Sequence, residues 1–248
     1  MIRIARGPRP PCLNPLFVAQ ETARYISTGE VVWNIKELKE ALLAFSDNKC
    51  AYCEIQLQVG PAYMEVEHFY AKSIHKSRVL DWDNLLPSCK RCNLAKGTWD
   101  VAVVGQDLID PTVSSPKGHI LFDTAYRPVG ITPEGINTVT EIHLDDIDRL
   151  GVPRFKFGER IKRKLEELEG DYNSLGTATT NRKRRATVRR IKNLLAKCRP
   201  TEPLSAVAAT VVARSPEYTS LKASLTVNGE WDQELTDLDL VVGDSALV

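Results

Sequence analysis

Apolar residues recur at helical spacing in several stretches of the chain. In the N-terminal part they fall on one side of a predicted helix, at Ile35, Leu38, Leu42 and Phe45. Asn34 directly precedes this run, and its side chain suits an N-cap, where an amide oxygen accepts a free backbone N–H. Further along, residues 145–169 predict two helices that separate near Gly151 and Pro153, because these residue types interrupt helices.

Two further helices are predicted in the last third of the chain. Aliphatic side chains keep helical spacing within a basic segment, at Val188, Ile191, Leu194 and Leu195. The basic residues around them are Arg182, Lys183, Arg184, Arg185, Arg189, Arg190, Lys192 and Lys197. This combination predicts a basic amphipathic helix. Residues 203–213 are mostly apolar and predict a buried helix, whereas from Gly229 onward six acidic residues and no basic one predict a partly ordered tail.

A short region between these helical stretches has the period of a β-strand. Met64 and Val66 alternate with polar residues, and the pair Glu67 and His68 closes this predicted strand. A second short strand or turn is predicted from Leu85, and Asn93 then opens a predicted helix. The expected fold class is therefore α+β, with a small core of two strands and a helix embedded in a mainly α-helical chain.

Length and composition are those of an ordinary soluble globular protein. A chain of 248 residues can form one large domain or two small ones. Its 43% hydrophobic and 26% charged residues argue against a disordered, fibrous or membrane-spanning chain. No apolar run approaches the roughly 20 residues that cross a bilayer, and the start lacks the apolar stretch of a secretory signal. We therefore expect a cytoplasmic protein without a membrane partner.

The net charge of +1 hides a strong polarity along the chain. Residues 151–200 hold 15 basic and 5 acidic residues, whereas residues 201–248 hold 2 basic and 8 acidic ones. The basic segment is either a solvated face or a surface that contacts phosphates. The acidic end either docks on a partner or covers the protein's own basic segment.

The strongest local signal is a set of two CxxC pairs, Cys50 with Cys53 and Cys89 with Cys92, with 35 residues between the pairs. Each pair lets two thiolates turn toward one tetrahedral ion, so the four cysteines predict a zinc site. A redox-active pair is the alternative, but two pairs in one chain favour zinc. This zinc would be structural, because four protein ligands leave no open position for a substrate. Cys12 and Cys198 lie outside any ligand spacing.

The segment between and around the pairs carries a series of short motifs. They are Tyr-Cys-Glu, Val-Glu-His-Phe, Trp-Asp-Asn-Leu-Leu, Ser-Cys-Lys-Arg-Cys-Asn and Lys-Gly, within about residues 50–97. In order and spacing they resemble the HNH endonucleases of the ββα-metal fold. They are similar in particular to the PtuB-type nucleases of Septu and retron-associated anti-phage systems, as is the later Leu-Ile-Asp-Pro. The resemblance implies a zinc-stapled ββα-metal core.

The same resemblance implies a role for each polar residue of this core. His68 would be the general base that deprotonates the attacking water. Glu67 and Asn93 would be ligands of one catalytic ion, Mg²⁺ or Mn²⁺, which takes hard oxygen ligands. Asn84 would hold the loop and orient His68. Lys96 would bind the substrate through a phosphate.

Two residues depart from the family pattern, and several histidines and tryptophans are expected to have no catalytic role. The third motif residue, often His, is Asn93, which favours Mg²⁺ or Mn²⁺. Ala71 stands where family members tend to have Pro. The remaining histidines are expected at the surface: His75, His119 and His143. Trp82 and Trp99 are expected in the core rather than stacked on bases.

The leading hypothesis is a metal-dependent HNH endonuclease that hydrolyses DNA as the effector of an anti-phage complex. The resemblance implies an ABC-type ATPase of the PtuA kind as its partner. One alternative is a non-catalytic zinc-stapled module that binds nucleic acid or a partner protein. Another is an HNH nuclease that acts on RNA, because the site reads a phosphate and not a base. Four segments are expected: helical 1–48, the nuclease core 49–110, the helical region with the basic segment 111–200, and the apolar helix with the acidic tail 201–248.

Overall fold

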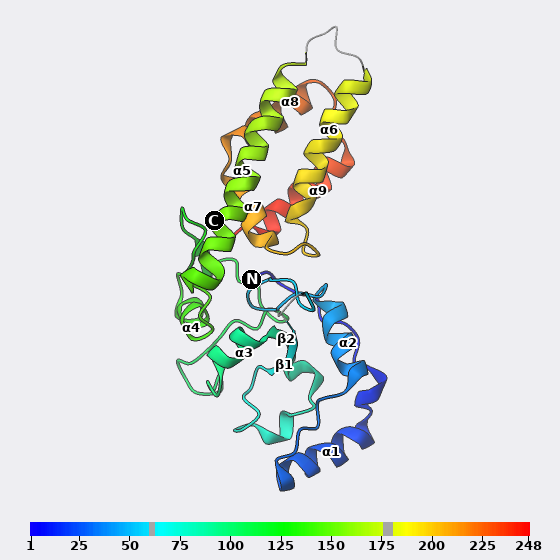
Figure 1. Ribbon diagram of the computed structural model, residues 1–248, viewed down its shortest axis with the longest axis vertical. Coiled ribbons are helices and arrows are strands. Elements are labelled where there is room, and N and C mark those ends of the chain that lie inside the picture. Colours follow the sequence, from blue (N-terminus) through cyan, green and yellow to red (C-terminus); the bar gives the residue numbers. More distant parts are fainter. Residues whose placement is uncertain (60–62, 176–180) are drawn as a thin grey trace. The chain divides into compact units, whose positions relative to one another are not determined.

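The computed structural model describes residues 1–59, 63–175 and 181–248 (Figure 1). Residues 60–62, in the expected nuclease core, and 176–180, in the expected helical region 111–200, lie outside the described residues. The chain divides into two compact units, Met1–Ile120 with Pro128–Asp145, and Leu121–Arg127 with Asp146–Val248. The expected segments 1–48 and 49–110 fall in the first unit, where α2 contacts both strands of the nuclease core, and 201–248 falls in the second, whereas the expected segment 111–200 is divided between the two units.

The N-terminal unit is built around an antiparallel hairpin. Strand β1 (Met64–His68) pairs with β2 (Leu85–Cys89), and the register sets His68 opposite Leu85. The helices of this unit are α1 (Pro15–Thr28), α2 (Lys36–Phe45), α3 (Lys90–Lys96) and α4 (Pro133–Glu141). Both α2 and α3 contact the two strands. A second two-stranded sheet pairs β3 (Ile120–Phe122) with β4 (Pro128–Gly130).

Two helix starts in this unit differ from the sequence-based expectation. Helix α2 begins after Ile35 without a side-chain cap, because the Asn34 side chain accepts a hydrogen bond from Lys39 instead. Helix α3 begins at Lys90 and not at Asn93, since strand β2 ends at Cys89 in extended conformation and the helix follows at once. Asn93 therefore lies one turn inside the helix, where it can meet β1.

The C-terminal unit is a group of helices around one buried helix. They are α5 (Val152–Asn173), α6 (Asn181–Leu195), α7 (Ser205–Arg214), α8 (Pro216–Val227) and α9 (Gln233–Ser245). Every residue of α7 from Ser205 to Val212 is buried, and α7 contacts α5 and α9. Helices α5 and α6 lie side by side (Figure 1). The helix predicted at residues 203–213 is therefore the centre of this unit.

The helical region ahead of α6 is less divided than expected. A short π-helical turn, Ile147–Gly151, leads into the single long helix α5. Pro153 lies in the first turn of α5, where a proline is tolerated because its missing N–H has no partner to lose. The predicted break near Gly151 is thus the start of one helix of 22 residues.

The acidic C-terminal segment is an ordered helix and not a partly ordered tail. Helix α9 buries Leu235, Leu238 and Val242 at helical spacing, and Asp232 caps it by accepting from the backbone N–H of Leu235. These apolar residues form a helix face that the six acids obscure in the sequence. Among the described residues, no helix has the length and apolar character needed to cross a membrane.

Candidate active site

The end of β1 presents its polar side chains to two different neighbours. Because side chains alternate along a strand, Glu65 and Glu67 share one face and His68 takes the other. Glu65 and Glu67 contact residues of α3. The His68 ring meets the ring of Trp33 edge to face, with 4.8 Å between their centroids. The two adjacent motif residues are therefore held by different parts of the chain.

The orientation of the His68 ring assigns a role to each of its nitrogens. Nε2 lies 3.0 Å from the carbonyl oxygen of Val79. Since a carbonyl can only accept, Nε2 carries the proton, and Nδ1 is left with a free lone pair. Nδ1 is buried and, within the described residues, has no hydrogen-bond partner. Burial, reinforced by the nearby charge of Lys72, lowers the pKa of His68 to about 3, so the imidazole is neutral and keeps the lone pair on Nδ1.

Asn84 holds the loop that supplies this carbonyl. Its side chain is fully buried; Oδ1 accepts from the N–H of Tyr70 at 2.6 Å, and Nδ2 donates to the carbonyls of Tyr70 at 3.2 Å and Arg78 at 3.0 Å. Val79 follows Arg78 directly, so the bond from Asn84 to Arg78 also places the oxygen that orients His68. This geometry is what the expected positioning role of Asn84 requires.

The carboxylate of Glu67 is buried next to the ammonium of Lys96. The residue is 2% exposed, and its Oε1 lies 2.7 Å from Nζ of Lys96, an ion pair without hydrogen-bond geometry. Burial raises the pKa of the Glu67 carboxyl, and the charge of Lys96 opposes this rise. Lys96 also donates to the carbonyl of His68 at 2.9 Å and is itself buried. In this structure its ammonium is engaged by the protein and does not face solvent.

Asn93 contacts β1 through Glu65, a residue that the sequence motifs do not identify. Its Nδ2 donates to Oε2 of Glu65 at 2.7 Å. With the amide nitrogen committed in this way, the amide oxygen of Asn93 is the atom left to act as a ligand. Together with Oε1 of Glu67, which contacts the Lys96 ammonium in the structure, it offers hard oxygen donors, and two protein ligands suit Mg²⁺, which keeps several waters. The residues present therefore fit a catalytic ion of this kind.

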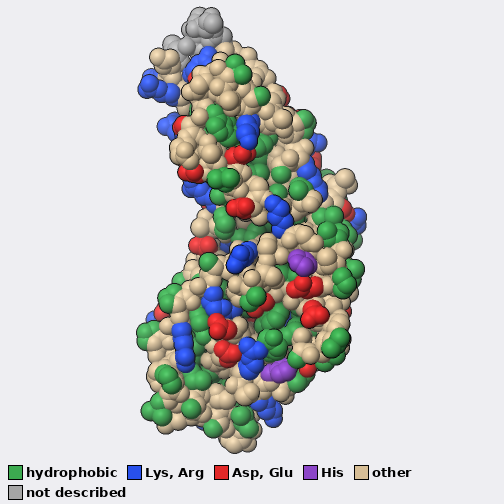
Figure 2. Space-filling view, turned by 180° about the vertical axis from the view of Figure 1, so that it is seen from behind, with side chains coloured by type: hydrophobic (Ala, Val, Ile, Leu, Met, Phe, Trp, Pro, Cys, Tyr) green, Lys and Arg blue, Asp and Glu red, His purple; other side chains and the backbone are tan. Residues whose placement is uncertain are grey.

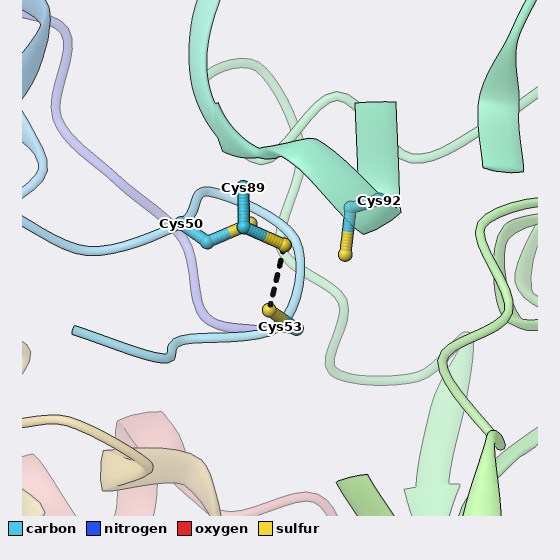
Figure 3. A group of neighbouring side chains, drawn as sticks. All are labelled: Cys50, Cys53, Cys89 and Cys92. Carbon is cyan, nitrogen blue, oxygen red and sulfur yellow. Dashed lines mark hydrogen bonds between the residues drawn. The ribbon is translucent and has the colours of Figure 1, made fainter. Parts of the chain in front are cut away.

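The four cysteines predicted to bind zinc meet at one point. They come from the loop Cys50–Cys53 and from the junction of β2 and α3, and their side chains converge (Figure 3). All four sulfurs lie within 4.8 Å of one another and are buried, with 3.8 Å between Cys53 and Cys89. Tetrahedral zinc with bonds of about 2.3 Å places its sulfurs about 3.8 Å apart. The cluster therefore fits zinc, which would tie the loop to both β2 and α3.

A cleft of about 620 Å³ lies beside the loop that Asn84 holds. Tyr70 and Arg78 line it, and the guanidinium of Arg78 lies 3.9 Å from the centroid of the Tyr70 ring. His119 and Glu134 also line the cleft, with 3.4 Å between Nδ1 and the carboxylate. The wall of the cleft thus includes the contact between Arg78 and Tyr70 and the residues that directly follow His68.

The histidines expected at the surface have partners that their sequence neighbours do not reveal. His75 pairs with Asp100 at 2.7 Å and is partly enclosed. His119 contacts the hydroxyl of Thr132 at 2.9 Å besides Glu134. Of the three, His143 is the exposed one, as expected.

Two residues outside the motif support the site from the N-terminal segment. Trp33 covers one edge of His68. Arg6 donates to the carbonyls of Trp82 at 2.6 Å and Leu85 at 2.8 Å, on either side of Asn84. Trp82 is buried, as expected of a core residue. Nothing in the sequence flags Arg6 or Trp33, because both act on residues that lie far along the chain.

Comparisons with known proteins agree with this geometry. Residues 50–98 match the family described as HNH endonuclease, a range that contains β1, β2, α3 and both cysteine pairs. Over most of its length the chain is similar to the Septu protein PtuB of Bacillus thuringiensis. The two are 36% identical over 220 residues, which cover 87% of this chain and 84% of that protein.

Proposed function

Because this chain belongs to the Septu PtuB family and is an HNH endonuclease, we propose that it cuts DNA with His68 as general base and Mg²⁺ or Mn²⁺ as catalytic ion. One observation carries the proposal: Nδ1 of His68 is an unpaired, buried base whose ring is held by the Val79 carbonyl. A side chain kept neutral and oriented in this way is suited to take a proton from water. Family membership argues against the alternative of a purely binding module.

Each polar residue then has a defined part in hydrolysis. Nδ1 of His68 accepts the proton of the attacking water, and Asn84 maintains the loop that orients the ring. Glu67 and the amide oxygen of Asn93 would hold the divalent ion. When bound, such an ion supplies positive charge that stabilises the phosphate and the leaving oxygen. Lys96, which neutralises Glu67 in the structure, is proposed to contact the phosphate in the metal-loaded protein.

The proposed setting is a defence complex. Membership in a Septu family supports a role as the nuclease effector of an anti-phage system, and we place an ABC-type ATPase of the PtuA kind as its partner. The proposed substrate is DNA, cut at its phosphodiester bonds, and RNA is the competing substrate that the test must include.

The test compares the wild-type chain with His68→Ala on plasmid DNA and on RNA, with Mg²⁺ or Mn²⁺, with and without the ATPase. We expect cleavage of DNA to fall by about 10²- to 10⁴-fold in the variant, the usual contribution of a positioned base. His143→Ala is the matched control, because His143 is exposed, and it should cleave at the wild-type rate. Zinc content and helix content should be the same in all three proteins. Full activity of His68→Ala would exclude the proposed mechanism, and cleavage of RNA alone would exclude the proposed substrate.

A further inference from the structure

Six of the seven basic residues of α6 fall into two groups in the folded C-terminal unit. In the first group the charge is compensated within the unit. Lys192 lies 2.7 Å from Glu234, Arg190 pairs with Asp171, and Arg184 lies 3.5 Å from Glu230. Helix α9 and the residues before it therefore cover part of the basic segment, and these pairs belong to the packing of the helices.

The second group is Arg182, Arg185 and Arg189, which we call the arginine stripe. All three are exposed, and among the described residues no carboxylate lies within 4.0 Å of any of them. Together with Ala186 they line a hollow of about 530 Å³. Figure 2 shows basic side chains standing out from the surface of this part of the unit. The stripe is thus a part of α6 whose charge no ion pair within the described residues compensates.

The spacing of the stripe suits a regular row of anions. Residues three and four apart lie on one face of a helix. With a rise of about 1.5 Å per residue, the stripe extends about 10 Å along α6. One strand of duplex DNA carries a phosphate about every 3.4 Å along the helix axis, so about three phosphates fall within that length. Each guanidinium can donate two parallel hydrogen bonds to a phosphate.

The lining of the hollow favours nucleic acid over a protein partner. Among the described residues, Ala186 is the one apolar residue that lines it, and no large aliphatic or aromatic residue contributes. Protein interfaces have an apolar core with few charges, whereas contacts to DNA are polar and strongly positive. The charge and the chemistry of the hollow match a phosphate backbone.

We propose that the arginine stripe binds the backbone of duplex DNA and forms a second contact with the substrate, in a unit separate from the HNH core. The proposal rests on DNA being the substrate of the proposed function. Such a contact carries no sequence information, and its affinity depends steeply on salt. It would keep DNA bound while the HNH core acts on individual phosphates.

The test measures binding of a short DNA duplex to the full-length chain that carries His68→Ala, so that no cutting occurs. Arg182→Gln, Arg185→Gln and Arg189→Gln are introduced together. Each lost phosphate contact lowers the slope of log affinity against log salt by about 0.9, so we expect the slope to fall by about 2.7. Between about 50 and 200 mM salt, the parent should therefore lose about 40-fold more affinity than the variant.

A matched control removes the same charge from another exposed helix face of the same unit. Lys156, Arg160 and Arg163 of α5 are exposed at similar spacing, but they lie among Glu159 and Glu166. Their replacement by Gln should leave the salt slope nearly unchanged. Arg182→Lys, Arg185→Lys and Arg189→Lys together should keep most of the slope, because the charges remain. Circular dichroism establishes that all variants are folded.

The outcomes separate this inference from the proposed function. An unchanged slope in the stripe variant, or an equal fall in the α5 control, would overturn the inference even if the wild-type chain cuts DNA. Tighter binding of an RNA duplex through the same arginines would overturn the assignment to DNA. Stripe-dependent DNA binding by a chain that cuts no nucleic acid would uphold the inference while the proposed function fails.

Discussion

Asn84 and Tyr70 are joined by two hydrogen bonds that run in opposite directions. Oδ1 of Asn84 accepts from the Tyr70 N–H at 2.6 Å, and Nδ2 donates to the Tyr70 carbonyl at 3.2 Å. One buried amide therefore fixes both polar groups of the residue that lies two positions after His68. The same amide reaches the carbonyl of Arg78 at 3.0 Å, and this links the two ends of the loop that orients His68.

Asn84→Ala should weaken both the fold and the site. It removes three hydrogen bonds and leaves partly buried main-chain groups without partners, which should cost about 2 to 4 kcal/mol of unfolding free energy. Urea unfolding measures this loss. Asn137→Ala is the matched control, because Asn137 also donates to two main-chain carbonyls, of Gly105 and Asp107, through hydrogen bonds that are exposed to solvent. Its cost should stay below about 1 kcal/mol, since water can replace its bonds. Equal losses in the two variants would contradict the role of Asn84.

Loss of a zinc ligand should unfold the nuclease core. Zinc contributes about 10 kcal/mol or more to folding in small domains with such sites, and here it would join the Cys50–Cys53 loop to β2 and α3. Cys50→Ser should abolish stoichiometric zinc, measured by elemental analysis, and lower the thermal unfolding temperature. Cys12→Ser is the control, because Cys12 lies outside the cluster, and it should retain zinc. A folded Cys50→Ser chain without zinc would show that the cluster is dispensable for the fold.

Glu65 should act as a positioning residue for Asn93. Since it accepts from Nδ2 at 2.7 Å, its loss frees the amide to rotate away from the metal site. Glu65→Ala should weaken Mn²⁺ binding, followed by calorimetry, by about 10- to 100-fold, as is usual for residues that orient a metal ligand. Glu65→Gln keeps an acceptor oxygen and should recover most of that affinity. If both variants bind Mn²⁺ as the wild type does, the amide needs no such support.

Lys96→Met should leave the Glu67 carboxylate buried without a counter-charge. Breaking a buried pair from one side costs about 3 to 5 kcal/mol, so the free energy of unfolding in chelator-free, Mg²⁺-free buffer should fall by that amount. Combining it with Glu67→Gln should restore part of the loss, because no charge is then buried. Adding Mg²⁺ should stabilise Lys96→Met and leave the double variant unaffected, since Glu67 is the proposed ligand. Identical urea midpoints for Lys96→Met and the wild type would refute this account of the pair.

Short-range patterns predicted the elements that carry the chemistry. Alternation from Met64 to His68 predicts β1, and the structure has a strand with these bounds. The spacing of the cysteine pairs predicts one cluster, and their sulfurs converge. The strand and each CxxC turn depend on residues close in sequence, whose geometry follows from the backbone conformation of a few neighbours.

Patterns that depend on distant partners were interpreted less well. The acids after Gly229 suggested a partly ordered tail, yet α9 buries three aliphatic residues and pairs with Lys192. Asn34 has the chemistry of a helix cap, but it bonds Lys39 instead. Packing of α9 within its unit decided the first case, and a side-chain bond to Lys39 in the first turn of α2 decided the second.

The sequence by itself determined which residue types could bind metal, accept a proton or neutralise a phosphate, because those capacities belong to the side chains and their short spacing. Tertiary structure decided which of these capacities remain free. In the folded chain, Nε2 of His68 is hydrogen-bonded whereas Nδ1 is not. The amide nitrogen of Asn93 donates to Glu65, which leaves the amide oxygen available. Ion pairs compensate some basic residues of α6, and the arginine stripe stays exposed. Those outcomes require contacts between residues far apart in the chain, and only the folded protein brings them together.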